Sequence, residues 1–356
     1  MRKLLLLGTA LAAVSLAMPA FAQSSWNDGD GSNGDGNNYS KPTFEVSLAA
    51  ALAGNSGHVA GNGAAIESQS TSANISGGSY NGSKGVSNTN QNAGANSVLQ
   101  NALAVSYIQG CNCSTTYTVA TGAALAAAGN RGEVENNSSS SRREVVGHYY
   151  SQRFFTDGNR DQDDYRLVPI YGPDNYVTAN IDSSFNGVTG VFQVNQNSGD
   201  NSLLQNSAAV AAVNPVSGTA LTLAGSLADA DNKGAVAGNY AREHSANASS
   251  TITKSFDRVN GVVNVNQNSG ANSLMQNSAA IGTVKLVAAS SDALAGAVAN
   301  ANTNGGVYCN TANLANGSAK VSMDSSFNGA QGVLQASQNT GANSLIQNSV
   351  SVAAVR

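Results

Sequence analysis

Residues 184–206 read SFNGVTGVFQVNQNSGDNSLLQN, and this stretch recurs three more times in a chain of 356 residues. The other copies are SYNGSKGVSNTNQNAGANSVLQN at 79–101, SFDRVNGVVNVNQNSGANSLMQN at 255–277 and SFNGAQGVLQASQNTGANSLIQN at 326–348. All four, which we call cassettes, fit S-[FY]-[ND]-x3-G-V-x4-Q-N-x-G-x-N-S-x2-Q-N without a gap. Such repetition is typical of architectures in which each unit buries its surface against the next.

The spacing of the cassettes divides the chain. The equivalent glutamines Gln91, Gln196, Gln267 and Gln338 are separated by 105, 71 and 71 residues. We therefore expect repeat units at 44–108, 109–213, 214–284 and 285–356. The long second unit contains a segment rich in charge and tyrosine at 131–176, which we interpret as an insertion.

Alternation within the cassettes predicts strands. Phe192, Val194 and Gln196 occupy every second position, which is the period of a β-strand. The segment SGDN at 198–201 supplies turn-forming residues, and a second strand can follow from Ser202. Alanine in the tails after the cassettes favours a helix, but the neighbouring Val and Ile favour a strand. We predict an all-β, β-solenoid-like fold of strand-arc-strand rungs with one irregular insertion.

The amides of the cassettes suggest a way to stabilise such a stack. Identical Asn and Gln side chains about 4.8 Å apart can hydrogen-bond as a ladder and so satisfy buried polar groups. The predicted ladder residues, which would also act in self-assembly, are Gln91, Asn92, Asn96, Gln100, Gln196, Asn197, Asn201, Gln205, Gln267, Asn268, Asn272, Gln276, Gln338, Asn339, Asn343 and Gln347. We expect the arc glycines to adopt a positive φ; these are Gly94, Gly199, Gly270 and Gly341.

Composition excludes several function classes. Charged residues make up 11% of the chain and the net charge is −4, which argues against nucleic acid as a partner and leaves self-association unhindered. The three histidines lie in unlike contexts, and no HExxH, G-x-S-x-G or P-loop pattern occurs. We therefore predict no enzyme, no catalytic residue, no cofactor and no metal site.

The first residues predict export. Arg2 and Lys3 precede an apolar run at 4–17, and small residues at 20–22 offer a cleavage point, as in a signal peptide of residues 1–22. We expect a flexible leader rich in Gly and Asp at 23–43, no transmembrane segment after cleavage, and a secreted protein associated with the cell surface. An oxidising compartment permits a disulfide, for which the candidates join Cys309 to Cys111 or Cys113.

The cassettes resemble the repeats of curlins, the subunits of bacterial surface amyloid fibres, although curlin repeats are shorter and nearly contiguous. The resemblance implies a secreted structural protein that assembles with itself or a related fibre subunit, uses outer-membrane secretion machinery and contributes to biofilm or attachment. An alternative is a monomeric β-solenoid adhesin that binds a glycan or a protein receptor through the 131–176 insertion.

Overall fold

The computed structural model describes residues 43–67, 70–108, 118–143, 145–153, 164–171, 174–216, 221–244, 246–286, 293–315 and 317–355. Every regular element among them is a β-strand, and they include no helix able to cross a membrane. The predicted signal peptide and nearly all of the leader lie outside the described residues, as do Cys111 and Cys113.

The strands form four successive rungs. Rung 1 comprises β1 (Thr43–Ala60), β2 (Gly63–Glu67), β3 (Ser70–Ile75), β4 (Lys84–Asn92) and β5 (Val98–Ile108). Rung 2 comprises β6 (Thr118–Glu135), β7 (Ser138–Arg142), β10 (Asn175–Asp182), β11 (Thr189–Asn197) and β12 (Leu203–Val216). Rung 3 comprises β13 (Leu221–Ala237), β14 (Tyr240–His244), β15 (Ala246–Thr253), β16 (Asn260–Asn268) and β17 (Leu274–Leu286). Rung 4 comprises β18 (Ala293–Tyr308), β19 (Thr311–Ala315), β20 (Ser318–Asp324), β21 (Gln331–Asn339) and β22 (Leu345–Val355).

Equivalent strands pair in parallel and build five four-stranded sheets. In every sheet the rungs follow one another in the order 1, 2, 3, 4. We name the sheets by position: the base sheet is β1-β6-β13-β18, the side sheet β2-β7-β14-β19, the outer sheet β3-β10-β15-β20, the cassette sheet β4-β11-β16-β21 and the inner sheet β5-β12-β17-β22. The cassettes are in exact alignment, since Gln91, Gln196, Gln267 and Gln338 lie opposite one another. This architecture confirms the predicted all-β, solenoid-like repeat fold.

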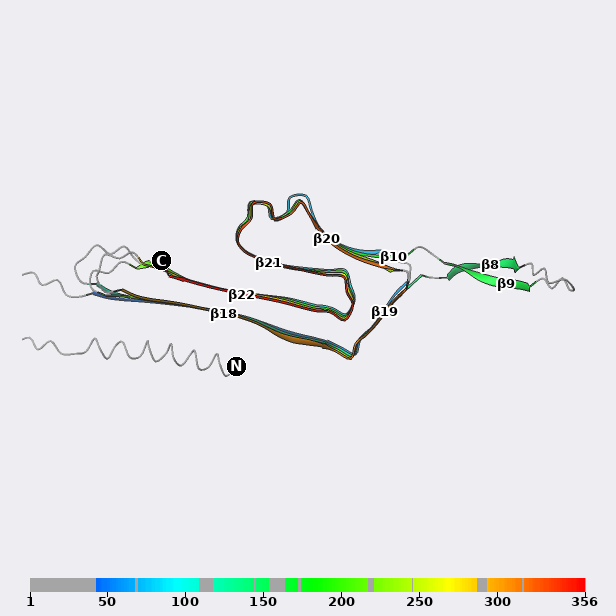
Figure 1. The fold of residues 1–356 in the computed structure, drawn as a ribbon, viewed down its shortest axis with the longest axis horizontal. Coiled ribbons are helices and arrows are strands. Elements are labelled where there is room, and N and C mark those ends of the chain that lie inside the picture. Colours follow the sequence, from blue (N-terminus) through cyan, green and yellow to red (C-terminus); the bar gives the residue numbers. More distant parts are fainter. Residues whose placement is uncertain are drawn as a thin grey trace, which may run out of the picture. The chain divides into compact units, whose positions relative to one another are not determined.

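The sheets lie in layers with small side chains between them. In rung 4, β22 runs beside β18 and β21 runs beside β22, while β19 forms a wall that leads to β20 (Figure 1). Alanines such as Ala126, Ala209 and Ala228 fill the space between the base and inner sheets. A second core of Ile, Val and Phe lies between the outer and cassette sheets. The alanine-rich tails are therefore strands because their small side chains let two sheets approach closely.

The first aromatic residue of each cassette joins a column of stacked rings. Tyr80, Phe185, Phe256 and Phe327 follow one another with ring centroids 4.6, 4.8 and 5.0 Å apart and planes within 7° of parallel. Each adopts a φ between 58° and 63°. A positive φ is costly for a bulky side chain, so the ring stacking and burial must offset it.

The insertion in rung 2 contains fewer residues than the segment 131–176 predicted from composition. Residues of rung 2 pair with residues 102 positions later in β6 and β7 but 71 positions later in β10 to β12, which places 31 additional residues between β7 and β10. They include an antiparallel hairpin of β8 (Val145–Arg153) and β9 (Asp164–Tyr171), which extends away from the five sheets (Figure 1). Residues 131–135 and 138–142, expected in the insertion, belong to β6 and β7, because exposed side chains such as Glu133 alternate with buried ones such as Val134 and Ser139.

Candidate functional site

The inner sheet contains an unbroken ladder of glutamine amides. Nε2 of each glutamine donates to Oε1 of its equivalent in the preceding rung, at 2.7 Å for each of the three steps. The ladder consists of Gln100, Gln205, Gln276 and Gln347. Gln205 and Gln276 are fully buried, where an unpaired amide would be costly. These residues lie together as the sequence predicts.

A second ladder stabilises the arc as well as the stack. Asn197 Nδ2 donates to Asn92 Oδ1 at 2.8 Å. In the same way, Asn268 Nδ2 donates to Asn197 Oδ1 and Asn339 Nδ2 donates to Asn268 Oδ1, both at 2.8 Å. Each of these asparagines also bonds across its own arc: for example, Gly199 N donates to Asn197 Oδ1 at 3.1 Å. One side chain thus closes the local turn and links neighbouring rungs.

A third asparagine column runs in the opposite direction. Asn201 Nδ2 donates forward to Asn272 Oδ1, and Asn272 Nδ2 to Asn343 Oδ1, at 3.1 Å in both steps. Asn96, predicted to belong to the same column, donates to the Ser138 carbonyl. These asparagines adopt a φ of 51° to 55°.

The remaining predicted glutamines mostly bond to backbone. Gln91, Gln196 and Gln267 donate from Nε2 to carbonyl oxygens of the following rung's outer sheet, at 3.0 to 3.2 Å. Gln338 has no following rung in the chain, and it donates to Gln267 Oε1 at 3.1 Å. The side-chain ladder expected here is therefore present at one step, since the outer-sheet carbonyls compete for the donors.

The expected positive φ of the arc glycines is wrong. A positive φ is absent from all four glycines, Gly94, Gly199, Gly270 and Gly341. The asparagine two residues after each glycine adopts the positive φ instead. The glycines are required for close approach instead: a Cβ on Gly94, Gly199 or Gly270 would overlap the carbonyl oxygen of the equivalent glycine in the next rung. A Cβ on Gly341 would meet only side-chain atoms within 4 Å, with the Ser344 hydroxyl nearest at 2.8 Å.

Further amide contacts involve asparagines that are not among the predicted ladder residues. Asn130 Nδ2 donates to Asn232 Oδ1 at 2.9 Å, and Asn137 and Asn239 form a second column with Asn310. Asn195 also connects the cassette and inner sheets through Asn101. None of these residues is among the ladder positions predicted from the cassettes. For Asn130, Asn232 and Asn239, the recurrent Asn-x-Gly and Gly-Asn pairs before the cassettes are the signal that could have identified them.

Two carboxylates lie inside the stack. Asp200 is buried in the arc of rung 2, at a position that is alanine in the other rungs, and accepts a hydrogen bond from Ala95 N at 2.6 Å. Burial raises the pKa of Asp200. Burial, together with the charge of Asp200, raises the pKa of Glu243 from 4.5 to about 7.

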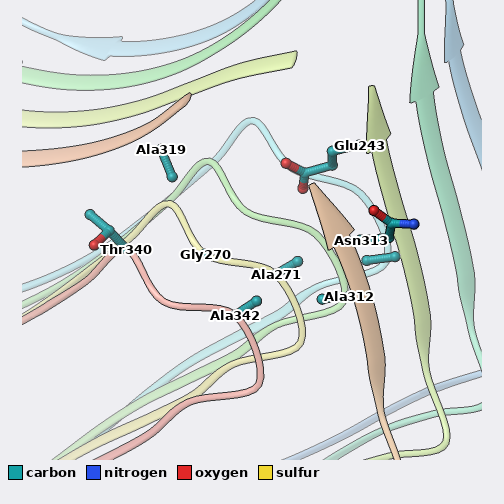
Figure 2. Close-up of a pocket in the computed structure, with 9 residues that line it drawn as sticks. Glu243, Gly270, Ala271, Ala312, Asn313, Ala319, Thr340 and Ala342 are labelled. Atoms are coloured by element: carbon teal, nitrogen blue, oxygen red, sulfur yellow. The ribbon is translucent and has the colours of Figure 1, made fainter. Parts of the chain in front are cut away.

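The Glu243 side chain lines a cavity of about 80 Å³. Figure 2 shows this carboxylate together with Ala271, Ala312 and Ala319 from the surrounding segments. The equivalents of Glu243 in rungs 2 and 4 are Ser141 and Leu314. The carboxylate is therefore particular to rung 3, and its mostly apolar surroundings disfavour the charged form.

Cys309 is exposed and has a φ of 50°. Both of its candidate partners lie outside the described residues, so the disulfide stays a prediction.

Replacing Gly199 with alanine should disrupt the stack. The added Cβ would overlap the Gly270 carbonyl oxygen, and overpacking at such a contact costs about 3 kcal/mol. The matched control is Gly225→Ala in β13, where a Cβ meets nothing within 4 Å. Urea unfolding followed by circular dichroism should show a large loss of stability for the first variant and a change within about 0.5 kcal/mol for the second. Equal losses would contradict the close-approach role.

The folded chain should lose stability as the pH rises through about 7. The folded state holds a proton on Glu243 that the unfolded state releases near its ordinary pKa of 4.5, so the stabilisation is fully present below pH 4.5 and lost above about 7. Glu243→Gln removes this titration without changing the side-chain shape. The urea midpoint should fall less between pH 5 and pH 8 for the variant than for the unchanged chain; an identical fall in both would show that Glu243 does not couple to folding.

The comparisons with known proteins agree with this geometry. Neither the curated proteins nor the solved structures include a match to the chain. A family model described as the functional amyloid protein FapB/FapC family matches residues 24–213 and, in an overlapping second match, residues 156–355. Together these matches cover all four cassettes, and the chain therefore belongs to the functional amyloid protein FapB/FapC family.

Proposed function

We propose that this protein is a secreted fibre subunit whose copies add end to end, with rung 1 of one copy on rung 4 of the preceding copy. The observation that carries the proposal is the shared register of all four rungs in all five sheets. Rung 4 presents to solvent the same kind of edge that rung 3 presents to rung 4. Open strand edges with unpaired backbone groups are templates for further pairing.

Unfinished amide ladders support the same junction. Gln205 Nε2 donates both to the Lys233 carbonyl and to Gln100 Oε1, whereas Gln100 Nε2 donates to the Arg131 carbonyl. A preceding rung 4 would offer Gln347 Oε1 to Gln100 at the same 2.7 Å step seen within the chain. A following rung 1 would offer Gln338 the outer-sheet carbonyl that Gln267 receives from Ser322.

The ladders also favour one orientation. The inner-sheet amides donate backward along the stack and the Asn201 column donates forward. A head-to-tail junction pairs donors with acceptors in both columns. A junction between two rung-4 edges would place like groups opposite each other, which leaves buried polar atoms unpaired.

Secretion and a place in the biofilm matrix complete the proposal. The predicted signal peptide at 1–22 supports export from the cytoplasm, and the family supports an extracellular fibre. Crossing the outer membrane would require dedicated secretion machinery, which is the expected partner besides the subunit itself.

Replacing Gly341 with alanine should block fibre growth while leaving the monomer folded. The added Cβ meets only side-chain atoms within the chain, but at the junction it would overlap the carbonyl of Gly94 in the next copy, as at each internal step. Gly296→Ala in the same rung is the control, because a Cβ there meets nothing within 4 Å. The equivalent position in rung 2 is already an alanine, Ala123.

The measurement is fibre growth of the purified mature chain, followed by amyloid dye binding and fibre diffraction. The unchanged chain and Gly296→Ala should polymerise after a lag and diffract near 4.7 and about 10 Å. Gly341→Ala should keep its β-rich circular dichroism spectrum and remain monomeric. A stable monomer for the unchanged chain would refute the fibre proposal, and normal growth of Gly341→Ala would refute this junction.

The β8–β9 hairpin supports a second function, the display of a ligand-binding surface. Tyr149, Tyr150 and Leu167 are 53%, 71% and 53% exposed. An isolated two-stranded hairpin is marginally stable in water, and exposed aromatic side chains are common in binding surfaces for glycans and proteins. On a fibre with four rungs per copy, the hairpins would recur roughly every 19 Å.

Deleting residues 144–174 separates the two functions. The deletion removes 31 residues and leaves one residue between β7 and β10, the same spacing as between β14 and β15, so the register of the rungs is kept. Fibre growth should continue at a similar rate, while attachment of the fibres to glycan-coated surfaces should fall. Loss of polymerisation with retained monomer folding would assign assembly to the hairpin instead of the ladders.

A further inference from the structure

Three potential metal ligands gather at the step between rungs 1 and 2. Ligand atoms of His58, Glu133 and Glu135 all lie within 4.8 Å of one another. His58 Nε2 lies 4.0 Å from Glu135 Oε2. His58 comes from β1 and the glutamates from β6, so the group spans two rungs of the base sheet.

Strand pairing places the three side chains on one face. His58 lies directly opposite Glu133, and Glu135 follows two residues later on the same face of β6. The residue between the glutamates, Val134, is fully buried on the other face. His58 and Glu133 are exposed and Glu135 is partly buried, so solvent and ions can reach the group.

Stacking does not account for this cluster. The column of Glu133 continues with Ala235 and Gly306, and that of Glu135 with Ala237 and Tyr308. Ladders elsewhere repeat one residue type, whereas here two carboxylates of like charge lie side by side at a single step. Their mutual repulsion would be relieved by a bound cation.

The neighbouring basic groups leave the carboxylates available. Arg131 shares the face of Glu133, and Lys233 lies opposite Arg131 in rung 3. Lys233 pairs with Asp231 at 3.2 Å. Within the described part of the chain, neither basic side chain lies within ion-pair distance of Glu133.

We propose that His58, Glu133 and Glu135 form a binding site for a divalent transition-metal ion of the zinc type. One imidazole nitrogen and two carboxylate oxygens are a donor set that Zn²⁺ accepts at about 2.0 to 2.2 Å, with water completing the coordination. Rotations of exposed side chains suffice to close the present separations. The bound ion would join the terminal rung to rung 2 and so restrain the edge on which another copy docks.

The test is isothermal titration of the untagged mature chain with Zn²⁺. We expect one ion per chain, and we expect His58→Ala and Glu133→Gln each to weaken binding at least about tenfold. The matched controls are His148→Ala, an exposed histidine of the hairpin, and Asp231→Asn, a carboxylate of the same base sheet; both should bind as the unchanged chain does.

Hydrogen exchange supplies a readout that does not depend on fibre formation. Zn²⁺ should slow amide exchange in β1 of the unchanged chain and of both controls, but not in His58→Ala. Undiminished binding by His58→Ala and Glu133→Gln, an equal loss in the controls, or no binding at millimolar Zn²⁺ would each overturn the site. None of these results depends on whether the copies assemble end to end.

Discussion

The spacing of about 4.8 Å between paired parallel strands governs this molecule. Because the rungs pair in register, every side chain lies against its own equivalents in the neighbouring rungs. A residue type is therefore acceptable only if it packs or bonds with the side chains at the equivalent positions. Gln205 succeeds through its amide, which donates on one side and accepts on the other. Phe256 succeeds through flat ring stacking, and Gly199 through the absence of a Cβ.

The same constraint explains why the chain contains so little charge. Like charges stacked at this spacing repel, and burial adds a desolvation cost. The buried acid Asp200 is accordingly flanked by Ala95 and Ala271 in its column, and Glu243 by Ser141 and Leu314. Glu133, by contrast, lies on the exposed face of β6. Charged residues that depart from the repeat thus occur where a side chain is exposed to solvent, as for Glu133, or where burial favours its protonated form, as for Asp200 and Glu243.

Much of this arrangement can be predicted from the sequence, because the fourfold cassette determines both register and the inner-sheet ladder. Gln100 and Gln205 lie in contact as their spacing predicts. The partners of Gln196 could not be predicted, since the competing carbonyl of Thr251 comes from a strand outside the cassette. The close-approach role of Gly199 could not be predicted either, because a sequence pattern does not show how closely the backbones of two rungs approach. Composition likewise placed residues 131–135 and 138–142 in the insertion, although their alternation places them in strands.

The contacts that stack the rungs within one chain can also stack rungs of different chains. The forces that hold rung 3 on rung 2 do not depend on chain connectivity, because most of their hydrogen bonds join residues 71 positions apart that no short loop brings together. An edge that can accept the next rung of its own chain can therefore accept the first rung of another. The edge pairs first with the next rung of its own chain because the effective concentration of a tethered rung is higher than that of a separate copy. Folding should consequently precede growth, and whatever restrains or loosens the terminal rungs will control where a fibre begins.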